Sequence, residues 1–203
     1  MPAFRYLALG DSYTIGESVA AEDRWPNQLA KLLDAHGIQA DLTIIARTGW
    51  TTSELWQGIQ ASEIQPPYDL VSLLIGVNNQ YRGYDINEYR DQFNFLLEKS
   101  IEYADGDANR VLVLSIPDWG VTPFASNRDR EKIAREIDKF NLLDRELSER
   151  AGVHYADVTE NSREADNDTT LIAPDGLHPS GKMYALWAEK TLPIVKEILI
   201  GSK

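Results

Sequence analysis

Apolar residues recur along the chain in two alternating patterns. Short and nearly continuous apolar runs predict buried strands at residues 4–9, 42–46, 69–75, 110–116 and 153–156. The longer segments between them have helical spacing or capping signals, which predicts helices at residues 22–36, 52–59, 86–103, 128–150 and from 181 toward 200. Strands that alternate with helices indicate right-handed crossovers and a parallel sheet covered by helices on both faces.

Two of the predicted helix starts carry capping residues. Thr51 or Thr52 can cap the second helix, because Glu54 is able to reach back to the backbone of the cap. The third helix is expected to begin near Asp85. Pro193 lies inside the last predicted helix, and we expect it to kink or interrupt that helix because proline lacks a backbone N–H.

Length and composition support this picture. The 203 residues favour one domain across residues 1–203, and 43% of them are apolar, which is enough for a hydrophobic core. Five strands suit a three-layer α/β/α domain. The sequence contains no internal repeat, low-complexity tract or linker that would divide it.

Charge excludes several classes of partner. Lys and Arg number 20 against 32 Asp and Glu, which gives a net charge of −12. Such a surface would repel nucleic-acid phosphates and anionic lipid, so we expect neither nucleic acid nor a membrane as a partner. The expected partner is a small molecule, and the sequence does not indicate an oligomeric state.

No residue pattern indicates a metal or a cofactor. The chain has no cysteine, which excludes thiolate catalysis, disulfides and cysteine-based zinc sites. The carboxylates at 164–168 are expected to form an acidic surface loop instead of a cation site. Residues 10–16 have neither the glycine spacing of a dinucleotide loop nor a phosphate-binding lysine. We therefore expect no metal and no cofactor.

No segment indicates targeting to a membrane. The N-terminal apolar stretch is too short for the core of a signal peptide, and no apolar run is long enough to cross a bilayer. We therefore expect a cytoplasmic protein, whereas a leader removed before this start would indicate secretion.

Ser12, Asp175 and His178 are the candidate catalytic residues. Ser12 stands directly after the first predicted strand, and Asp175-Gly176-Leu177-His178 lies near the other end of the chain. A serine hydroxyl becomes a nucleophile when a histidine takes its proton and a carboxylate orients that histidine. Asp175 and His178 supply both groups three residues apart, which predicts acyl transfer or ester hydrolysis.

Two further residues follow predicted strands and can donate hydrogen bonds to a developing oxyanion. Gly49 comes after the second strand and offers a backbone N–H that no side chain covers, and Asn78 comes after the third and offers an amide. Alternatively, Gly49 is needed only because its backbone has a positive φ, and Asn78 is only a residue of a turn. Because the carboxyl ends of parallel strands share one edge, we expect both residues to converge there with Ser12 and His178.

Aromatic residues are expected at the same edge. Those that follow strand ends are Tyr13, Trp50, Tyr81 and Trp119, and they either line the substrate pocket or cover its rim. The sequence shows no long apolar channel and no membrane-binding helix, which favours short-chain, water-soluble esters.

These blocks resemble the SGNH, or GDSL, hydrolase family, which is named for a Ser nucleophile, an oxyanion-hole Gly and Asn, and a catalytic His. The matching blocks, spread over nearly the whole chain, are Gly10-Asp11-Ser12, Gly49, Gly76-Val77-Asn78 and Asp175-Gly176-Leu177-His178. The resemblance implies a flavodoxin-like α/β/α sandwich with strand order 2-1-3-4-5. It also implies metal-free ester hydrolysis by a Ser12–His178–Asp175 triad, with an oxyanion hole formed by Ser12, Gly49 and Asn78.

The third block departs from the family pattern, which usually continues Gly-x-Asn-Asp, because position 79 is Asn. The usual aspartate is not part of the triad, so we expect the chemistry to survive and the hydrogen bonding of the loop to change. The family includes lysophospholipase-like esterases, thioesterases, arylesterases and carbohydrate deacetylases, and its motifs do not distinguish them.

Other functions stay open beside the expected serine esterase. An acyltransferase or a carbohydrate deacetylase would use the same triad. A non-catalytic ligand-binding domain would not need the three residues together, and a flavodoxin-type redox protein would carry a flavin.

Overall fold

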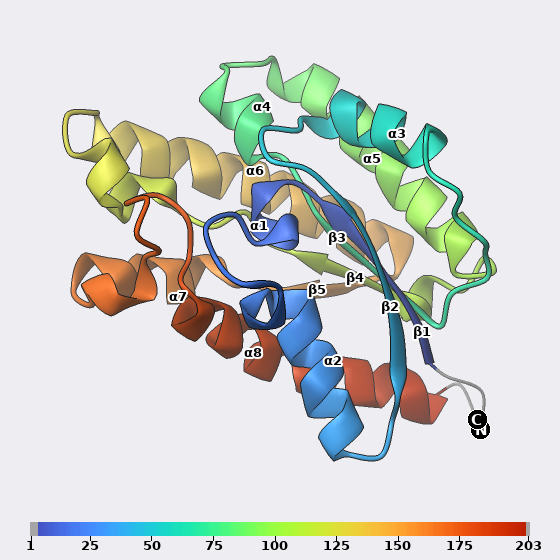
Figure 1. Ribbon diagram of the computed structural model, residues 1–203. Helices are drawn as coiled ribbons and strands as arrows, with labels where there is room; N and C mark the ends of the chain where they lie inside the picture. Colours follow the sequence, from blue (N-terminus) through green and yellow to red (C-terminus); the bar gives the residue numbers. More distant parts are fainter. Residues whose placement is uncertain (1–3, 202–203) are drawn as a thin grey trace.

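The computed structural model describes residues 4–201 and has a parallel sheet at its centre (Figure 1). The sheet is five-stranded with the order β2-β1-β3-β4-β5, as expected from the sequence and the family resemblance. Its strands are β1 (Phe4–Gly10), β2 (Ala40–Ala46), β3 (Leu70–Leu74), β4 (Val111–Leu114) and β5 (His154–Ala156). The predicted strands are therefore confirmed, although β3, β4 and β5 are one to three residues shorter than expected.

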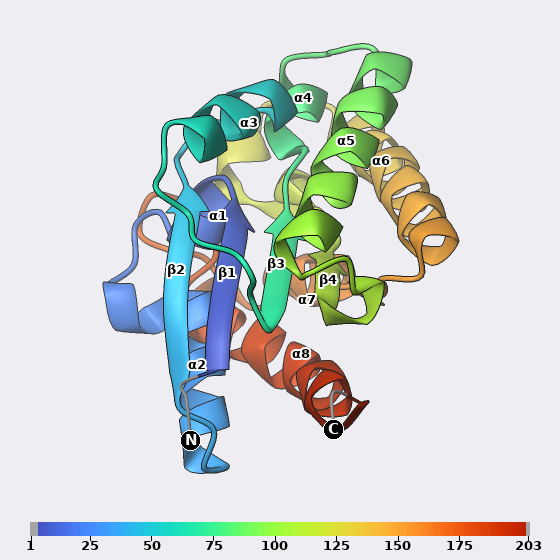
Figure 2. The same ribbon diagram turned by 90° about the vertical axis from the view of Figure 1, so that its right-hand side faces the viewer.

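Helices cover both faces of the sheet and complete the three layers (Figure 2). The longer helices are α2 (Trp25–Ala35), α3 (Thr52–Gln60), α5 (Ile86–Tyr103), α6 (Arg130–Ala151) and α8 (Gly181–Gly201). Helices α2 and α8 pack together on one face, and α3, α5 and α6 lie side by side on the other. The expected α/β/α sandwich is confirmed.

Burial along the strands follows their position in the sheet. Every residue of β3 and β4 is buried, and only Arg5 breaks the buried run of β1. The edge strands β2 and β5 are mostly half-buried. This difference explains why the central strands have nearly continuous apolar runs.

The register of the strands brings their carboxyl ends to the same level. Gly10 at the end of β1 is paired with Ala46 of β2 on one side and with Leu74 of β3 on the other. The chain segments that follow these strands therefore leave the sheet at one edge, where the strand order reverses around β1.

The capping predictions are confirmed. The Thr51 side chain accepts from the N–H of Glu54 while the Glu54 carboxylate accepts from the N–H of Thr51, which forms a capping box. Asp85 caps α5 by accepting from the N–H groups of Asn87 and Glu88. By contrast, the expected interruption at Pro193 does not occur, because α8 is one helix from Gly181 to Gly201 with Pro193 inside it.

Three single-turn helices stand where the sequence indicates only turns or loops. They are α1 (Ser12–Ile15), α4 (Val77–Tyr81) and α7 (Thr159–Arg163). Such short helices have no apolar period to detect. The polar stretch after α7 also contains 3₁₀ turns, and two of its carboxylates form ion pairs, Asp166 with Arg130 and Asp168 with Lys182. Within residues 4–201, no helix has both the length and the apolar character needed to span a membrane.

Candidate active site

Ser12 is the first residue of α1 and directly follows the tight turn that leaves β1. The preceding Asp11 caps α1 through its side chain, which accepts from the N–H of Tyr13 at 3.0 Å. A side chain at Gly10 would place its Cβ 2.2 Å from Thr14 Oγ1 and 2.5 Å from the Leu74 carbonyl oxygen, so this close approach requires glycine. The turn holds the Ser12 side chain at the carboxyl edge of the sheet, with only 5% of the residue exposed.

Asp175 and His178 form the second half of the site. The imidazole Nδ1 and Asp175 Oδ2 are 2.6 Å apart. The other carboxylate oxygen accepts from the backbone N–H groups of Leu177, at 2.9 Å, and His178, at 3.0 Å. A third side chain, Ser18, donates its hydroxyl to Oδ2 at 2.7 Å. Four donors therefore fix the orientation of this carboxylate.

The pKa values of Asp11 and Asp175, the two aspartates of this site, are shifted in opposite directions. Complete burial raises the pKa of Asp11 to about 7, against the smaller lowering effects of the Tyr13 N–H and the Asn78 amide. Partial burial also acts to raise the pKa of Asp175, but its hydrogen bonds with His178, Ser18 and the backbone N–H groups outweigh burial and hold that pKa well below its usual range. Asp175 is therefore a stable anion facing the imidazole.

One cavity of about 190 Å³ joins the two halves of the site. Ser12 and His178 both line it, together with Asn78 from α4. Among the described residues, no hydrogen bond joins the Ser12 hydroxyl to the imidazole. Such contacts in a hydrolase are often long until substrate is bound. The complete lining consists of Ser12, Tyr13, Val77, Asn78, Tyr81, Trp119, Phe124, Leu177 and His178.

The two expected oxyanion donors differ in their surroundings. Asn78 donates through Nδ2 to the Trp50 carbonyl at 2.9 Å and makes a longer contact of 3.4 Å with Asp11. Gly49 has a φ of +86°, which glycine adopts readily, and its carbonyl accepts from Arg82. Gly49 does not line the cavity. The structure thus brings Asn78, but not Gly49, into the cavity with Ser12.

Asn79, which stands where the family usually has Asp, is fully buried and links α4 to the start of α3. Its Oδ1 accepts from the N–H of Thr52 at 3.1 Å, and its Nδ2 donates to the Thr52 hydroxyl at 2.8 Å. The Thr52 hydroxyl is then free to donate to Gln92. A carboxylate at position 79 could not donate to this hydroxyl, so the amide allows the chain of hydrogen bonds to continue.

Three of the four expected aromatic residues line the cavity. Tyr13 lies edge-on to the His178 ring at 5.8 Å between centroids, and the Tyr81 and Trp119 rings contact each other at 5.4 Å. The expectation for Trp50 needs correction, because its indole packs on α3, where a Cβ on Gly58 would lie 2.1 Å from it. The small Gly58 provides a place for this ring away from the cavity.

A cluster not anticipated from the sequence closes the cavity rim. Phe124 lies within 6.4 Å of the Tyr81 ring and 6.1 Å of the Trp119 ring, between centroids. The Arg128 guanidinium lies 5.1 to 5.4 Å from the centroids of all three rings and donates to the Tyr81 hydroxyl at 3.1 Å. The sequence signal for this cluster was Phe124 in a polar loop, four residues before Arg128.

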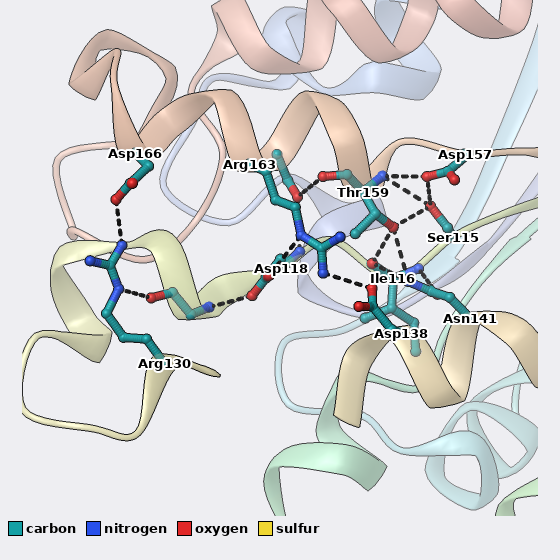
Figure 3. A network of polar contacts seen from close by, with 12 residues as sticks. Ser115, Ile116, Asp118, Arg130, Asp138, Asn141, Asp157, Thr159, Arg163 and Asp166 are labelled. Carbon is teal, nitrogen blue, oxygen red and sulfur yellow. Dashed lines mark hydrogen bonds and ion pairs between the residues drawn. The ribbon is translucent and has the colours of Figure 1, made fainter. Parts of the chain in front are cut away.

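A polar network holds the loop that carries Trp119 (Figure 3). Asp118 is buried, accepts from Arg163 Nε at 2.9 Å, and accepts from the N–H of Gly120 at 2.8 Å. Arg130 donates to the Gly120 carbonyl at 2.6 Å from the other side. The Trp119 indole N–H donates to Gln80 at 2.8 Å. These contacts fix the position of the aromatic wall relative to the cavity.

Several solved structures share this fold. TesA aligns with a TM-score of 0.76 at 18% sequence identity, over 96% of this chain and 99% of TesA. The psychrotrophic esterase EstA from Pseudoalteromonas sp., solved with the inhibitor monoethylphosphonate, aligns with a TM-score of 0.73 at 19% identity, over 97% and 98%. The acetylxylan esterase Axe2 from Geobacillus stearothermophilus aligns with a TM-score of 0.74 at 18% identity, over 95% and 94%.

Sequence comparison gives the family. A search of curated proteins gave no match. The GDSL-like Lipase/Acylhydrolase family, however, matches residues 8–186, which contain the serine turn, the asparagine block and the aspartate–histidine turn described above. This match covers most of the chain, so the protein belongs to the GDSL-like lipase/acylhydrolase family and is an ester-hydrolysing enzyme.

Proposed function

We propose that this enzyme hydrolyses carboxylic esters with Ser12 as nucleophile, His178 as general base and Asp175 as the carboxylate that orients the base. The observation that carries the proposal is the 2.6 Å contact between His178 Nδ1 and Asp175, combined with the lining of one cavity by Ser12 and His178. A buried serine that shares a cavity with an imidazole oriented by a carboxylate fits the arrangement that activates a hydroxyl.

The reaction proceeds in two steps. Ser12 Oγ attacks the ester carbonyl and transfers its proton to His178, and the imidazolium then returns this proton to the departing alcohol. A water molecule next attacks the acyl-serine, His178 accepts one of its protons, and the acid leaves as the Ser12 hydroxyl is restored. Asp175 stabilises the imidazolium formed in each step.

We assign the oxyanion hole to the Ser12 N–H, the Asn78 amide and the Gly49 N–H. One amide proton of Asn78 is engaged by the Trp50 carbonyl at 2.9 Å, whereas the 3.4 Å contact to Asp11 is weak. The second proton is therefore the one available to a tetrahedral intermediate. Gly49 would have to join through its backbone as the loop before Trp50 adjusts around substrate.

The cavity favours a short acyl group. Its volume of about 190 Å³ is below the ~300–1,000 Å³ common for pockets that hold drug-sized ligands. The rim formed by Tyr81, Trp119 and Phe124 is held together by Arg128. Esters of acetic acid and of other short acids fit a cavity of this size. The shared fold with an acetylxylan esterase makes acetylated sugars a natural second group of substrates to test.

The test uses purified wild type and S12A on nitrophenyl esters from acetate to palmitate and on acetylated xylo-oligosaccharides. We expect wild type to favour the shortest esters and S12A to lose about 10³-fold or more of kcat. A fluorophosphonate probe should label wild type at Ser12 and leave S12A unlabelled. Full activity in S12A would refute the nucleophile, and a preference for palmitate would refute the short-chain assignment.

Product analysis separates hydrolysis from acyl transfer. In the presence of a competing alcohol, a hydrolase releases mainly free acid, whereas an acyltransferase forms mainly the new ester. Ester binding without turnover, and without labelling of Ser12, would indicate a ligand-binding domain instead.

A further inference from the structure

Two non-glycine residues in the described part of the chain have a positive φ. They are Ser18, at 66°, and Asp105, at 62°. Side chains rarely adopt this conformation, and it persists where the surrounding structure imposes it, often at functional sites. Asp105 lies in the exposed turn after α5, whereas Ser18 lies beside the aspartate–histidine turn.

The Ser18 hydroxyl contacts the carboxylate oxygen that faces the imidazole. It donates to Asp175 Oδ2 at 2.7 Å, and the same oxygen lies 2.6 Å from His178 Nδ1. The backbone donors to Asp175 come from its own turn and reach only Oδ1. Ser18 is therefore the donor that ties this carboxylate to a separate part of the chain.

The segment around Ser18 is itself anchored to the nucleophile turn. The N–H of Glu17 donates to the Ser12 carbonyl at 3.0 Å, and the N–H of Val19 donates to the Gly16 carbonyl at 3.3 Å. The Glu17 carboxylate accepts from the Thr48 hydroxyl, at the end of β2. These contacts hold the left-handed backbone that presents the Ser18 hydroxyl to Asp175.

We infer that Ser18 is a positioning residue for the proposed triad, an inference that rests on the proposed function. A carboxylate held only at Oδ1 can turn about its Cβ–Cγ bond, and the imidazole would turn with it. A donor on Oδ2 blocks this rotation and links the orientation of the base to the segment that carries the nucleophile. Ser18 is exposed, so water can replace part of this function, and its loss lowers kcat without abolishing activity.

The experiment compares S18A, S18G and the matched control D105G on a short nitrophenyl ester. S18A removes the hydroxyl and keeps the strained backbone, whereas S18G removes both. We expect kcat to fall about tenfold in S18A and S18G, which corresponds to about 1.4 kcal/mol in activation free energy, while KM stays within about twofold. The thermal midpoint of S18G should not fall, because glycine adopts this φ without strain. D105G makes the same backbone change far from the site and should keep wild-type kcat.

The rate of fluorophosphonate labelling separates the two hypotheses. If Ser12 is labelled in wild type and equally fast in S18G, with unchanged kcat, Ser18 does not position the triad and only this inference fails. If Ser12 is not labelled in wild type, the proposed nucleophile itself is wrong. A fall in kcat for D105G equal to that for S18G would show a general effect of glycine in turns, and would also overturn the inference.

Discussion

Asp11 and Asp175 are two carboxylates at one edge of the sheet, and the protein treats them in opposite ways. Asp11 is completely buried and receives a single close donor, the Tyr13 N–H at 3.0 Å. Asp175 is partly exposed and has four donors. Burial raises the pKa of Asp11 to about 7, and the donors hold the pKa of Asp175 far below that of Asp11. The number of donors, set against the degree of burial, decides how readily each carboxyl group loses its proton.

The difference suits the two positions. In the proposed mechanism Asp175 must remain ionised to stabilise the imidazolium, so it needs donors that favour the anion. Asp11 shapes the turn that carries Ser12, and a cap bond requires an acceptor oxygen and no full charge. A second permanent anion next to the proposed nucleophile would also oppose the negative oxyanion that the proposed mechanism forms there.

The largest expected effect is on turnover, and it should distinguish Asp175 from Asp11. Asp175→Asn should lower kcat by about 10³–10⁴-fold, because the imidazole loses the anion that fixes its tautomer. Asp11→Asn keeps an acceptor for the Tyr13 N–H, so its kcat should stay within about tenfold of wild type. Steady-state kinetics on one short ester measures both variants. Equal losses would mean that Asp11, too, takes part in the chemistry.

The next effect is on stability and concerns Asp11 alone. Its pKa rises from 3.8 to about 7 on folding, so the folded state holds this proton more tightly than the unfolded chain. Stability is therefore lost as the pH rises from about 4 to 7, by up to ~4 kcal/mol from a shift of this size. Asp11→Asn removes this loss. Urea unfolding of both proteins at several pH values in this window should show the variant gaining stability relative to wild type as the pH rises.

A parallel pH dependence of the two proteins would contradict this assignment. It would mean that Asp11 is already ionised in the folded state under these conditions.

A third carboxylate would sharpen the comparison. Asn79→Asp places a carboxyl at a fully buried position with only the Thr52 N–H and hydroxyl as donors, and the Thr52 hydroxyl could then no longer donate to Gln92. We expect it to behave like Asp11, with a loss of about 1–3 kcal/mol in the free energy of unfolding at neutral pH that shrinks toward pH 5. Urea unfolding at pH 5 and pH 7.5 provides the measurement. A loss that grows toward pH 5 would show that two donors suffice to stabilise a buried anion here.

The smallest effect concerns Asp175 in acid. Its pKa is lowered on folding, so the carboxylate contributes stability above the ordinary aspartate pKa, and this contribution is lost as the pH falls. Because the side chain is 30% exposed, we expect no more than about 1 kcal/mol between pH 5 and pH 2. Unfolding curves of wild type and Asp175→Asn should converge over this range. Curves that diverge toward pH 2 would show that folding does not lower the pKa of Asp175.

The sequence predicts the sheet and the edge that carries the candidate site, because both depend on local signals. Continuous apolar runs identify the central strands, and the residues directly after them necessarily lie at one edge. The cavity wall depends on packing between distant segments, which local patterns do not encode. Trp50 lies away from the cavity because Gly58 leaves room on α3, and Phe124 reaches the rim because Arg128 gathers three rings. The opposite charges of Asp11 and Asp175 likewise follow from burial and donors that appear only in three dimensions.

The Ser18–Asp175 hydrogen bond spans 157 positions of the chain. During synthesis the ribosome therefore makes the proposed nucleophile, Ser12, early and the turn with Asp175 and His178 late. If the proposed triad is correct, the growing polypeptide has no esterase activity for most of translation, and activity arises only when the segment with Asp175 and His178 folds against the segment with Ser12. Expression of a fragment that stops before residue 170 should accordingly yield a product with no esterase activity, whatever structure its first strands attain.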